Sequence, residues 1–312
     1  MKYKGKKIAL LFAGGTTITE KGIVGSTVNN ERDIDNWLAQ ILEISLMAEI
    51  IPIFISSKSD GVELWKKIGQ VVNNNIDKVD GFVLTLDVDS IITIGSALSF
   101  SLQNLNKPVI ITGSQITKET IKLNNWQEIK KKSYGGLGIK ANLINAVQLA
   151  TMEAPAVLVM FGNRIIRAVK TTRVYSIGLN IFESIDQKYS GRIDFGISLS
   201  EKFVTSNKKI ELINEFKKNI DIINYFSGLE INTSSKKEGV ILKNLSNLEL
   251  VPKKIKQPFI VYNRYLVLEN NILVNNMTWE TTVVKFMWAL GQTNDKKKIN
   301  ELMKKEICKE FI

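Results

Sequence analysis

Two short polar turns hold the side chains that could carry out chemistry. The first is Ala13-Gly14-Gly15-Thr16, which follows an apolar run over residues 8–13. Its two glycines allow a sharp backbone turn and leave room for a ligand, and Thr16 then presents a hydroxyl. The second turn, residues 85–90, follows the apolar run 81–84. Polar side chains at the carboxyl end of a buried strand are where open α/β sheets bind ligands.

The sequence contains no histidine, and Cys308 is its only cysteine. This composition excludes Ser-His-Asp and Cys-His catalysis, as well as a His-ligated metal or a structural zinc site. Any hydrolysis must use hydroxyls, carboxylates, lysines or tyrosines. A single thiol forms no intrachain disulfide, which favours a reducing compartment. We expect Cys308 to have a packing or surface role.

Two of the polar positions also have an ordinary structural interpretation. Ser90 could cap the helix that follows, and the acidic Asp89 would be favourable near a helix start. This interpretation and a ligand-binding role are equally compatible with the sequence. Ser57 lies in Ser56-Ser57-Lys58-Ser59-Asp60, where serine and aspartate are typical helix caps.

Apolar runs alternate with amphipathic stretches through the first part of the chain. This alternation predicts a mostly parallel sheet with helices on both faces. Strands are predicted at 8–13, 50–55, 81–84, 109–112 and 156–161, and helices at 35–47, 60–73, 94–104 and 141–152. In the first helix, Leu42 and Leu46 are expected to contribute to the apolar face.

The alternation loosens after about residue 184, and a second set of elements follows. We predict a two-domain α/β protein with a larger N-terminal domain, 1–195, a linker, 196–204, and a smaller C-terminal α/β domain, 205–312. The second domain is predicted to contain a helix around 208–219, strands near 239–242 and 259–262, and a closing helix from about Trp279. Residues 124–134 are predicted to be a long loop or insertion.

The formal net charge is +11, and lysines are spread along the chain. Because no aromatic-interleaved basic motif accompanies the lysine runs, we interpret them as solvated faces and do not expect nucleic-acid binding. The apolar run near the N-terminus is shorter than the roughly 7–15 residues of a signal-peptide core. No stretch approaches the roughly 18 apolar residues of a membrane span. We therefore expect a cytoplasmic protein without membrane contacts.

Taken together, the motifs resemble the L-asparaginase/glutaminase family, particularly its cytoplasmic type. Thr16 after the Gly-Gly turn matches the family's nucleophilic threonine. Leu86-Asp87-Val88-Asp89-Ser90 aligns without a gap with the family's His-Gly-Thr-Asp-Thr signature. The resemblance extends over about residues 6–310 and is weakest between about 195 and 275. Further similar segments are 96–100, 107–115, 141–146, 167–174, 182–184, 276–280 and 290–292.

The resemblance implies an asparaginase-like two-domain fold, no metal or organic cofactor, and a role for each matching residue. Thr16 would attack a side-chain amide to form an acyl-enzyme, which water resolves. Asp89 and Ser57 would hold the carboxylate and amine of a small amino acid such as L-asparagine. Glu280 would contact the ligand from a neighbouring subunit, and this implies a homodimer or homotetramer.

The sequence departs from the family at the positions that transfer protons. Val88 replaces the second catalytic threonine and has no hydroxyl. Arg173 replaces the catalytic lysine, and an arginine does not release its proton to act as a base. Lys170 lies close to Arg173 in the sequence and is a candidate substitute base, although nothing in the sequence directs it toward the site. Thr85 and Ser90 have hydroxyls, but both are on the wrong register to point where the Val88 side chain points.

Two hypotheses follow from these substitutions. In the first, the chain is an amidohydrolase that converts asparagine or glutamine with Thr16 as nucleophile and Arg173 as an altered relay member. In the second, it is a catalytically inactive member that binds a small amino acid or serves as a regulatory or structural subunit. Loss of an acid–base pathway costs about 10²–10⁴-fold in rate, which favours the second hypothesis.

Overall fold

The computed structural model describes residues 5–13, 17–20, 23–27, 31–39, 41–55, 61–114, 139–174, 180–228, 236–245, 248–252, 255–263 and 273–312. Thr16, Ser57 and the loop predicted at 124–134 lie outside these ranges. The other predicted site residues lie within them: Val88, Asp89, Arg173 and Glu280.

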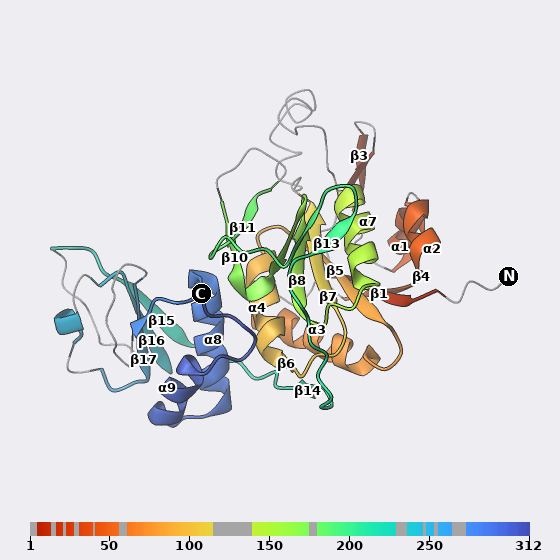
Figure 1. Ribbon diagram of the computed structural model, residues 1–312. Helices are drawn as coiled ribbons and strands as arrows, with labels where there is room; N and C mark the ends of the chain where they lie inside the picture. Colours follow the sequence, from red (N-terminus) through yellow and green to blue (C-terminus); the bar gives the residue numbers. More distant parts are fainter. Residues whose placement is uncertain are drawn as a thin grey trace.

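The largest element is an eight-stranded sheet with the order β13-β12-β9-β8-β7-β5-β1-β4 (Figure 1). Its five strands from β8 to β4 are parallel, and β9, β12 and β13 join antiparallel. The parallel strands are almost continuous apolar runs, as expected for strands buried on both faces. The bounds are β1 Lys7–Phe12, β4 Glu49–Phe54, β5 Gly81–Asp87, β7 Val109–Ser114, β8 Val157–Phe161, β9 Arg164–Arg167, β12 Gly191–Ile193 and β13 Ile197–Leu199.

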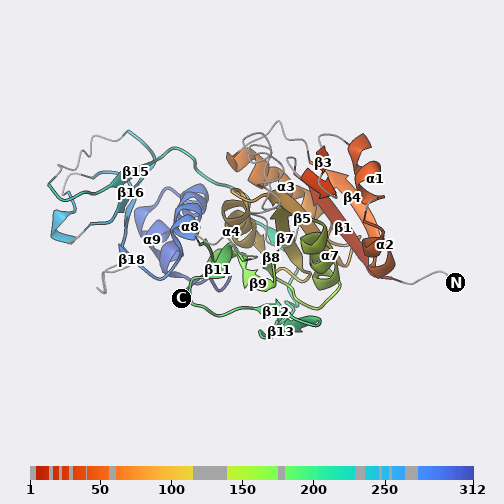
Figure 2. The ribbon, with the colours of Figure 1, turned by 90° about the horizontal axis from the view of Figure 1, so that it is seen from above.

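Helices cover both faces of this sheet, which confirms the predicted layered α/β architecture (Figure 2). On one face, α3 (Gly61–Asn75) and α4 (Ile91–Ser101) pack into an apolar cluster that contains Leu84, Leu86 and Val88. On the other face, α1 (Arg32–Leu38), α2 (Leu42–Met47) and α7 (Ile139–Ala150) pack with Val83 and Ile110. Two hairpins accompany them: β2 (Thr17–Glu20) with β3 (Ile23–Thr27), and β10 (Thr171–Arg173) with β11 (Phe182–Ser184).

A second, smaller unit follows in the chain. It contains the parallel sheet β15-β16-β17-β18 and the helices α8 (Trp279–Gln292) and α9 (Lys296–Lys304). The strands are β15 Ile220–Asn224, β16 Gly239–Lys243, β17 Phe259–Tyr262 and β18 Leu273–Val274. In Figure 1, α8 lies between this sheet and α4. A third apolar cluster joins the two units through Phe100, Phe286 and Trp288.

The single helix predicted over 35–47 is wrong, because the structure divides it into α1 and α2. The amide of Ile41 donates to the carbonyl of Leu38 at 2.9 Å and closes the first helix. After this break, Ile41 and Ile44 are fully buried, whereas Leu42 and Leu46 are 69% and 78% exposed. The prediction that Leu42 and Leu46 face the core is therefore also wrong.

The helix predicted around 208–219 is wrong as well. The short strand β14 (Glu211–Leu212) pairs there with β6 (Leu102–Gln103). The amide of Ile213 donates to Ser101 O, and the amide of Lys217 donates to Met287 O. Backbone groups that find such partners elsewhere in the fold do not need the i→i−4 bonds of a helix.

No helix among the described residues is both long and apolar enough to cross a membrane.

The domain limits 1–195 and 205–312 remain a prediction. The segment 211–217 bonds to α4 and β6 of the first unit and to α8 of the second.

Candidate functional site

The candidate site is the turn between β5 and α4, at the carboxyl end of the parallel strand β5. A carboxylate oxygen of Asp87 accepts a hydrogen bond from the amide of Asp89 at 3.1 Å, and the amide of Ser90 donates to Asp87 O at 3.0 Å. Ser90 occupies the N-cap position of α4, but its side chain makes no capping hydrogen bond. The turn is thus stabilised by Asp87, as in an Asx turn, and the Ser90 side chain does not act as the helix cap that the sequence left open.

Val88 and Asp89 point to different environments. The side chain of Val88 is only 3% exposed and belongs to the apolar cluster between the sheet and α4. The side chain of Asp89 is 69% exposed. The turn therefore presents a carboxylate to solvent and holds an apolar side chain at the adjacent position.

Arg173 forms an ion pair with Asp89. The guanidinium Nη1 donates to a carboxylate oxygen of Asp89 across 84 positions in the sequence. Arg173 is the last residue of β10, which pairs with β11 through Arg173 and Phe182. Pairing of these two strands places the guanidinium beside the β5–α4 turn, so the structure brings two of the sequence-predicted site residues together.

Lys170 is held in a different group of side chains. Its ammonium forms an ion pair with Asp186 at 2.8 Å, and the Ser184 hydroxyl donates to the same carboxylate at 2.6 Å. Burial on its own raises the pKa of Asp186, but the hydrogen bonds from Lys170, Ser184 and the Lys188 amide outweigh it and leave the pKa lowered. The Lys170 ammonium is thus engaged by Asp186, whereas Asp89 of the candidate site pairs with Arg173.

Two threonines near the site were not assigned a binding or packing role from the sequence. The buried hydroxyl of Thr85 donates to Leu11 O at 3.3 Å, so it faces the neighbouring strand β1. Thr112 is its register partner on β7, and the buried Thr112 hydroxyl has no hydrogen-bond partner within the described part of the chain. A threonine within an apolar strand run is the only signal the sequence offers for this pair.

Asn142, in the family-like segment 141–146, has a clear positioning role. Its amide nitrogen donates to Gly113 O at 3.0 Å, and its amide oxygen accepts from the Gly162 amide at 3.1 Å. The side chain is buried, so both bonds stabilise α7 against the carboxyl ends of β7 and β8. Asn142 thereby supports the sheet edge that carries the site.

Glu280 lies in the first turn of α8. That helix is capped by the Thr278 side chain, which accepts from the Thr281 amide at 3.1 Å. The buried Thr281 hydroxyl then donates to Val169 O at 2.8 Å and lies 3.0 Å from the Ser96 hydroxyl. These bonds orient α8 against α4. Among the described residues, no hydrogen bond or ion pair joins Glu280 to the Asp89–Arg173 pair, and its role toward a neighbouring subunit stays a prediction.

The nucleophile predicted at Thr16 and the ligand-binding residue predicted at Ser57 lie outside the described residues. Their neighbours are described: β1 ends at Phe12, four positions before Thr16, and α3 begins at Gly61, four positions after Ser57. The pairing of β1 with both β4 and β5 places the carboxyl ends of these three strands at one edge of the sheet. Within the described ranges, no three His, Cys, Asp or Glu side chains form a group that could hold a metal ion.

Comparison with known proteins gives consistent matches. The family described as "Asparaginase, N-terminal" matches residues 7–205. An L-asparaginase of Thermococcus kodakarensis is 26% identical over 280 residues, covering 80% of this chain and 81% of that protein. A Metallosphaera sedula protein, named as one of the subunits of glutamyl-tRNA(Gln) amidotransferase, is 24% identical over 357 residues, covering 98% of this chain and 76% of that protein.

Solved structures show the same fold. The thermostable L-asparaginase from Thermococcus kodakarensis superposes with a TM-score of 0.74 at 23% identity, covering 98% of this chain and 99% of that chain. L-asparaginase I from Vibrio cholerae superposes with a TM-score of 0.75 at 22% identity, covering 99% of each chain. At these identities the likeness is one of fold, and the architecture predicted from the sequence is confirmed.

Proposed function

Because this chain belongs to the asparaginase family, we propose that its candidate site binds a small amino acid such as L-asparagine and that Val88 and Arg173 suppress hydrolysis of the side-chain amide. The observation that carries the proposal is the ion pair between Arg173 and Asp89. It supports a site that keeps a carboxylate for a ligand and has an arginine where the family has a proton-transferring lysine.

Asp89 remains accessible to a ligand in spite of this pair. The side chains of Arg173 and Asp89 are 53% and 69% exposed. Exposed ion pairs contribute about 1 kcal/mol or less, because water screens them and long side chains lose entropy in forming them. The ammonium group of an amino acid can therefore replace the guanidinium at little cost, with Ser57 as the second proposed contact.

The proposed loss of activity follows from the groups around Asp89. Thr16 as nucleophile would need a base, since a threonine hydroxyl is almost fully protonated near neutral pH. Val88 offers no hydroxyl to relay the proton, and the Arg173 guanidinium keeps its own. Lys170 is bound to Asp186. We expect the missing acid–base pathway to lower the rate by about 10²–10⁴-fold.

A second candidate is an active asparaginase or glutaminase, which the name of the Thermococcus relative favours. The Metallosphaera relative is named as part of an amidotransferase, and this supports a role for the present chain as a regulatory or structural subunit with partner chains. We further propose a homodimer or homotetramer in which Glu280 contacts the ligand of a neighbouring subunit. Light scattering on the purified protein would measure its mass, and a monomer would contradict this assembly.

The first experiment measures ammonia release from L-asparagine and L-glutamine. We expect turnover near background for the natural protein and a gain of at least about tenfold for Val88→Thr combined with Arg173→Lys, because the relay is restored. Thr16→Ala added to that double variant should abolish the gain. Lys170→Ala tests the substitute base and should leave any residual rate unchanged.

Ordinary turnover by the natural protein, lost in Thr16→Ala, would contradict suppressed hydrolysis and establish the second candidate. The binding proposal has its own readout: L-asparagine should raise the melting temperature of the natural protein but not of Asp89→Asn. Equal shifts for the two proteins would exclude Asp89 as the ligand contact.

A cytoplasmic location is also proposed, and cell fractionation would test it.

A further inference from the structure

A cavity of about 290 Å³ lies near the amino ends of the parallel strands, away from the β5–α4 turn at their carboxyl ends. Val157, the first residue of β8, and Leu105, in the segment that leads into β7, line it. Both mark the amino ends of parallel strands, whereas Asp89 follows the carboxyl end of β5. The cavity is therefore separate from the candidate site.

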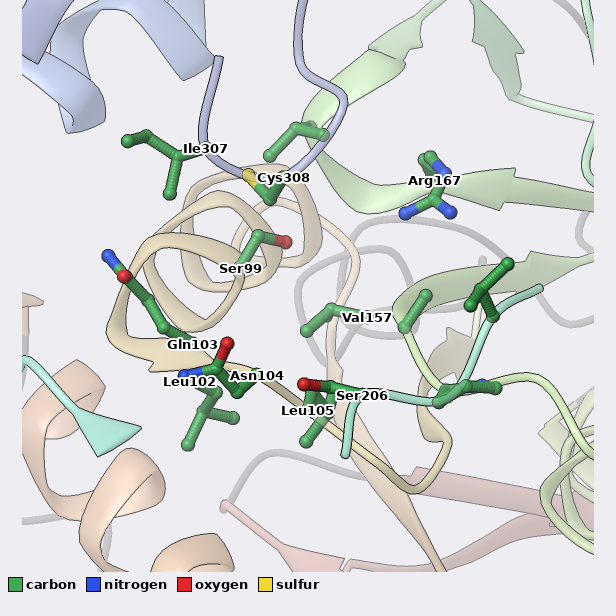
Figure 3. A pocket seen from close by; sticks show the side chains of 14 residues that line it. Ser99, Leu102, Gln103, Asn104, Leu105, Val157, Arg167, Ser206, Ile307 and Cys308 are labelled. Atoms are coloured by element: carbon green, nitrogen blue, oxygen red, sulfur yellow. The ribbon is translucent and has the colours of Figure 1, made fainter. Parts of the chain in front are cut away.

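Three parts of the chain form the walls of this cavity. Figure 3 shows Ser99 of α4 beside Ile307 and Cys308 of the C-terminal tail (residues 305–312), with Arg167 across from them. Arg167 reaches this edge because β9 runs antiparallel to β8, so that Arg167 pairs with Leu158. Many of the lining side chains are apolar, and they include Leu102, Leu105, Val157, Val169, Val204 and Ile307.

The charge at the cavity is positive. Arg167 is the only ionised side chain among the described residues that line it. Arg167 donates three hydrogen bonds to Glu201 through Nε and Nη2, at 2.6 to 3.0 Å. Lys309 donates to the same carboxylate at 2.9 Å. Two cations thus share one carboxylate, and Nη1 of Arg167 has no hydrogen-bond acceptor in the described part of the chain.

The part of the tail that lines the cavity is held by a buried acid. A carboxylate oxygen of Glu310 accepts from the amide of Cys308 at 2.8 Å, and Glu310 also accepts from the amide of Ile307 at 3.0 Å. Glu310 itself pairs with Lys285 of α8 at 2.6 Å, and both side chains are fully buried. Cys308 therefore has a defined place in the cavity wall.

We propose that this cavity is a binding site for a small carboxylate with an apolar body. The apolar wall takes the body, and Arg167, with its unused Nη1 and the surplus positive charge, takes the carboxylate. The volume lies at the lower end of the range of about 300–1,000 Å³ for small-molecule sites, so the ligand is compact. The proposal is independent of any activity at Asp89.

The only cysteine of the chain makes a direct test possible. Purified protein is equilibrated with equal concentrations of 3,3′-dithiodipropionate, 2-hydroxyethyl disulfide and cystamine, together with their thiols. In each exchange the Cys308 thiolate attacks one sulfur of the reagent, forms a mixed disulfide and releases the other half as a thiol. Because burial raises the pKa of the Cys308 thiol, the mixture is kept at mildly alkaline pH until the adducts measured by intact mass no longer change.

We expect the carboxylate adduct to exceed the ammonium adduct by about tenfold in the folded protein. The preference should disappear in Arg167→Gln and in urea-unfolded protein. In both, the adduct ratio should reflect only the intrinsic disulfide-exchange equilibria of the reagents. Equal adducts in the folded protein would overturn the proposal, and so would a preference that Arg167→Gln leaves intact.

A non-covalent measurement tests the proposed carboxylate site if Cys308 does not react with the disulfide reagents. Calorimetry should detect binding of 4-phenylbutyrate to the natural protein and no binding of 4-phenylbutan-1-amine. Val204→Trp should block 4-phenylbutyrate by filling the cavity, while Val204→Ala should not; Val204 is 79% exposed, so neither change disturbs the core. Failure of 4-phenylbutyrate to bind, or unchanged binding to Val204→Trp, would contradict the proposed site.

Discussion

Glu201 is a partly buried carboxylate, and its ionisation should affect the stability of the protein. Burial on its own raises the pKa of Glu201, but hydrogen bonds from Arg167 and Lys309 outweigh it and leave the pKa below its ordinary value of 4.5. With the folded pKa depressed, the stabilisation is fully present above about pH 4.5 and is lost as the pH falls through the folded value. Urea unfolding measured between pH 7 and pH 3 should show this loss.

The variant Glu201→Gln should be less stable at pH 7 and should lose less stability on acidification than the natural protein, because it has no proton to take up. Glu63→Gln is a matched control, since Glu63 is an exposed glutamate on α3. The same dependence on pH in Glu201→Gln and in the natural protein would show that this carboxylate does not determine acid sensitivity.

The C-terminal tail is attached to α8 by one buried ion pair, and this makes the element sensitive to a single change. The Lys285 ammonium donates to Glu310 and to the carbonyls of Met303 and Lys305 at 2.6 to 3.0 Å. Lys285→Met leaves the Glu310 carboxylate buried without its partner, and we expect a loss of about 3–5 kcal/mol in the free energy of unfolding. Urea denaturation provides the measurement.

The double variant Lys285→Met with Glu310→Met tests the origin of that loss. It removes both charges, so stability should recover, but only in part, because the amides of Ile307 and Cys308 lose their acceptor. Lys297→Met, at an exposed lysine of α9, serves as the control and should have little effect. If the double variant is no more stable than Lys285→Met, the lost stability arises from packing and not from the unpaired buried charge.

At the scale of the whole molecule, the two units share one apolar cluster. Phe100 of α4 stacks on Trp288 of α8 with ring centroids 6.0 Å apart, and Phe216 and Phe286 belong to the same cluster. We therefore propose that the units 1–195 and 205–312 unfold together in one transition. Circular dichroism and tryptophan fluorescence should give the same urea midpoint.

Trp288→Ala should lower that midpoint through a cost of about 3–5 kcal/mol and should begin to separate the two curves, since it opens the shared cluster. Leu42→Ala, at an exposed position on α2, is the control and should shift neither curve. Two well-separated transitions in the natural protein would mean that the predicted domains fold independently.

The layered α/β fold was predictable because its strands are buried on both faces and appear as apolar runs, such as 81–84 and 109–112, that need no tertiary context to be recognised. The second unit was less predictable. Residues 208–219 have helix-compatible composition, but their backbone bonds to α4, β6 and α8, partners that no local pattern reveals. Helix propensity is a weak prior that such contacts override.

The sequence by itself determined the family-like turns, the absence of histidine chemistry and the replacement of two polar positions by Val88 and Arg173. Only the tertiary structure decided which charges meet: Arg173 with Asp89, and Lys170 with Asp186 instead of with the site. It also decided that Arg167 and the C-terminal tail meet at one cavity, with Glu201 bound to Arg167. The physical reason is that a local sequence pattern involves residues that are close together in the chain. An ion pair, by contrast, forms only after strand pairing has brought distant residues together.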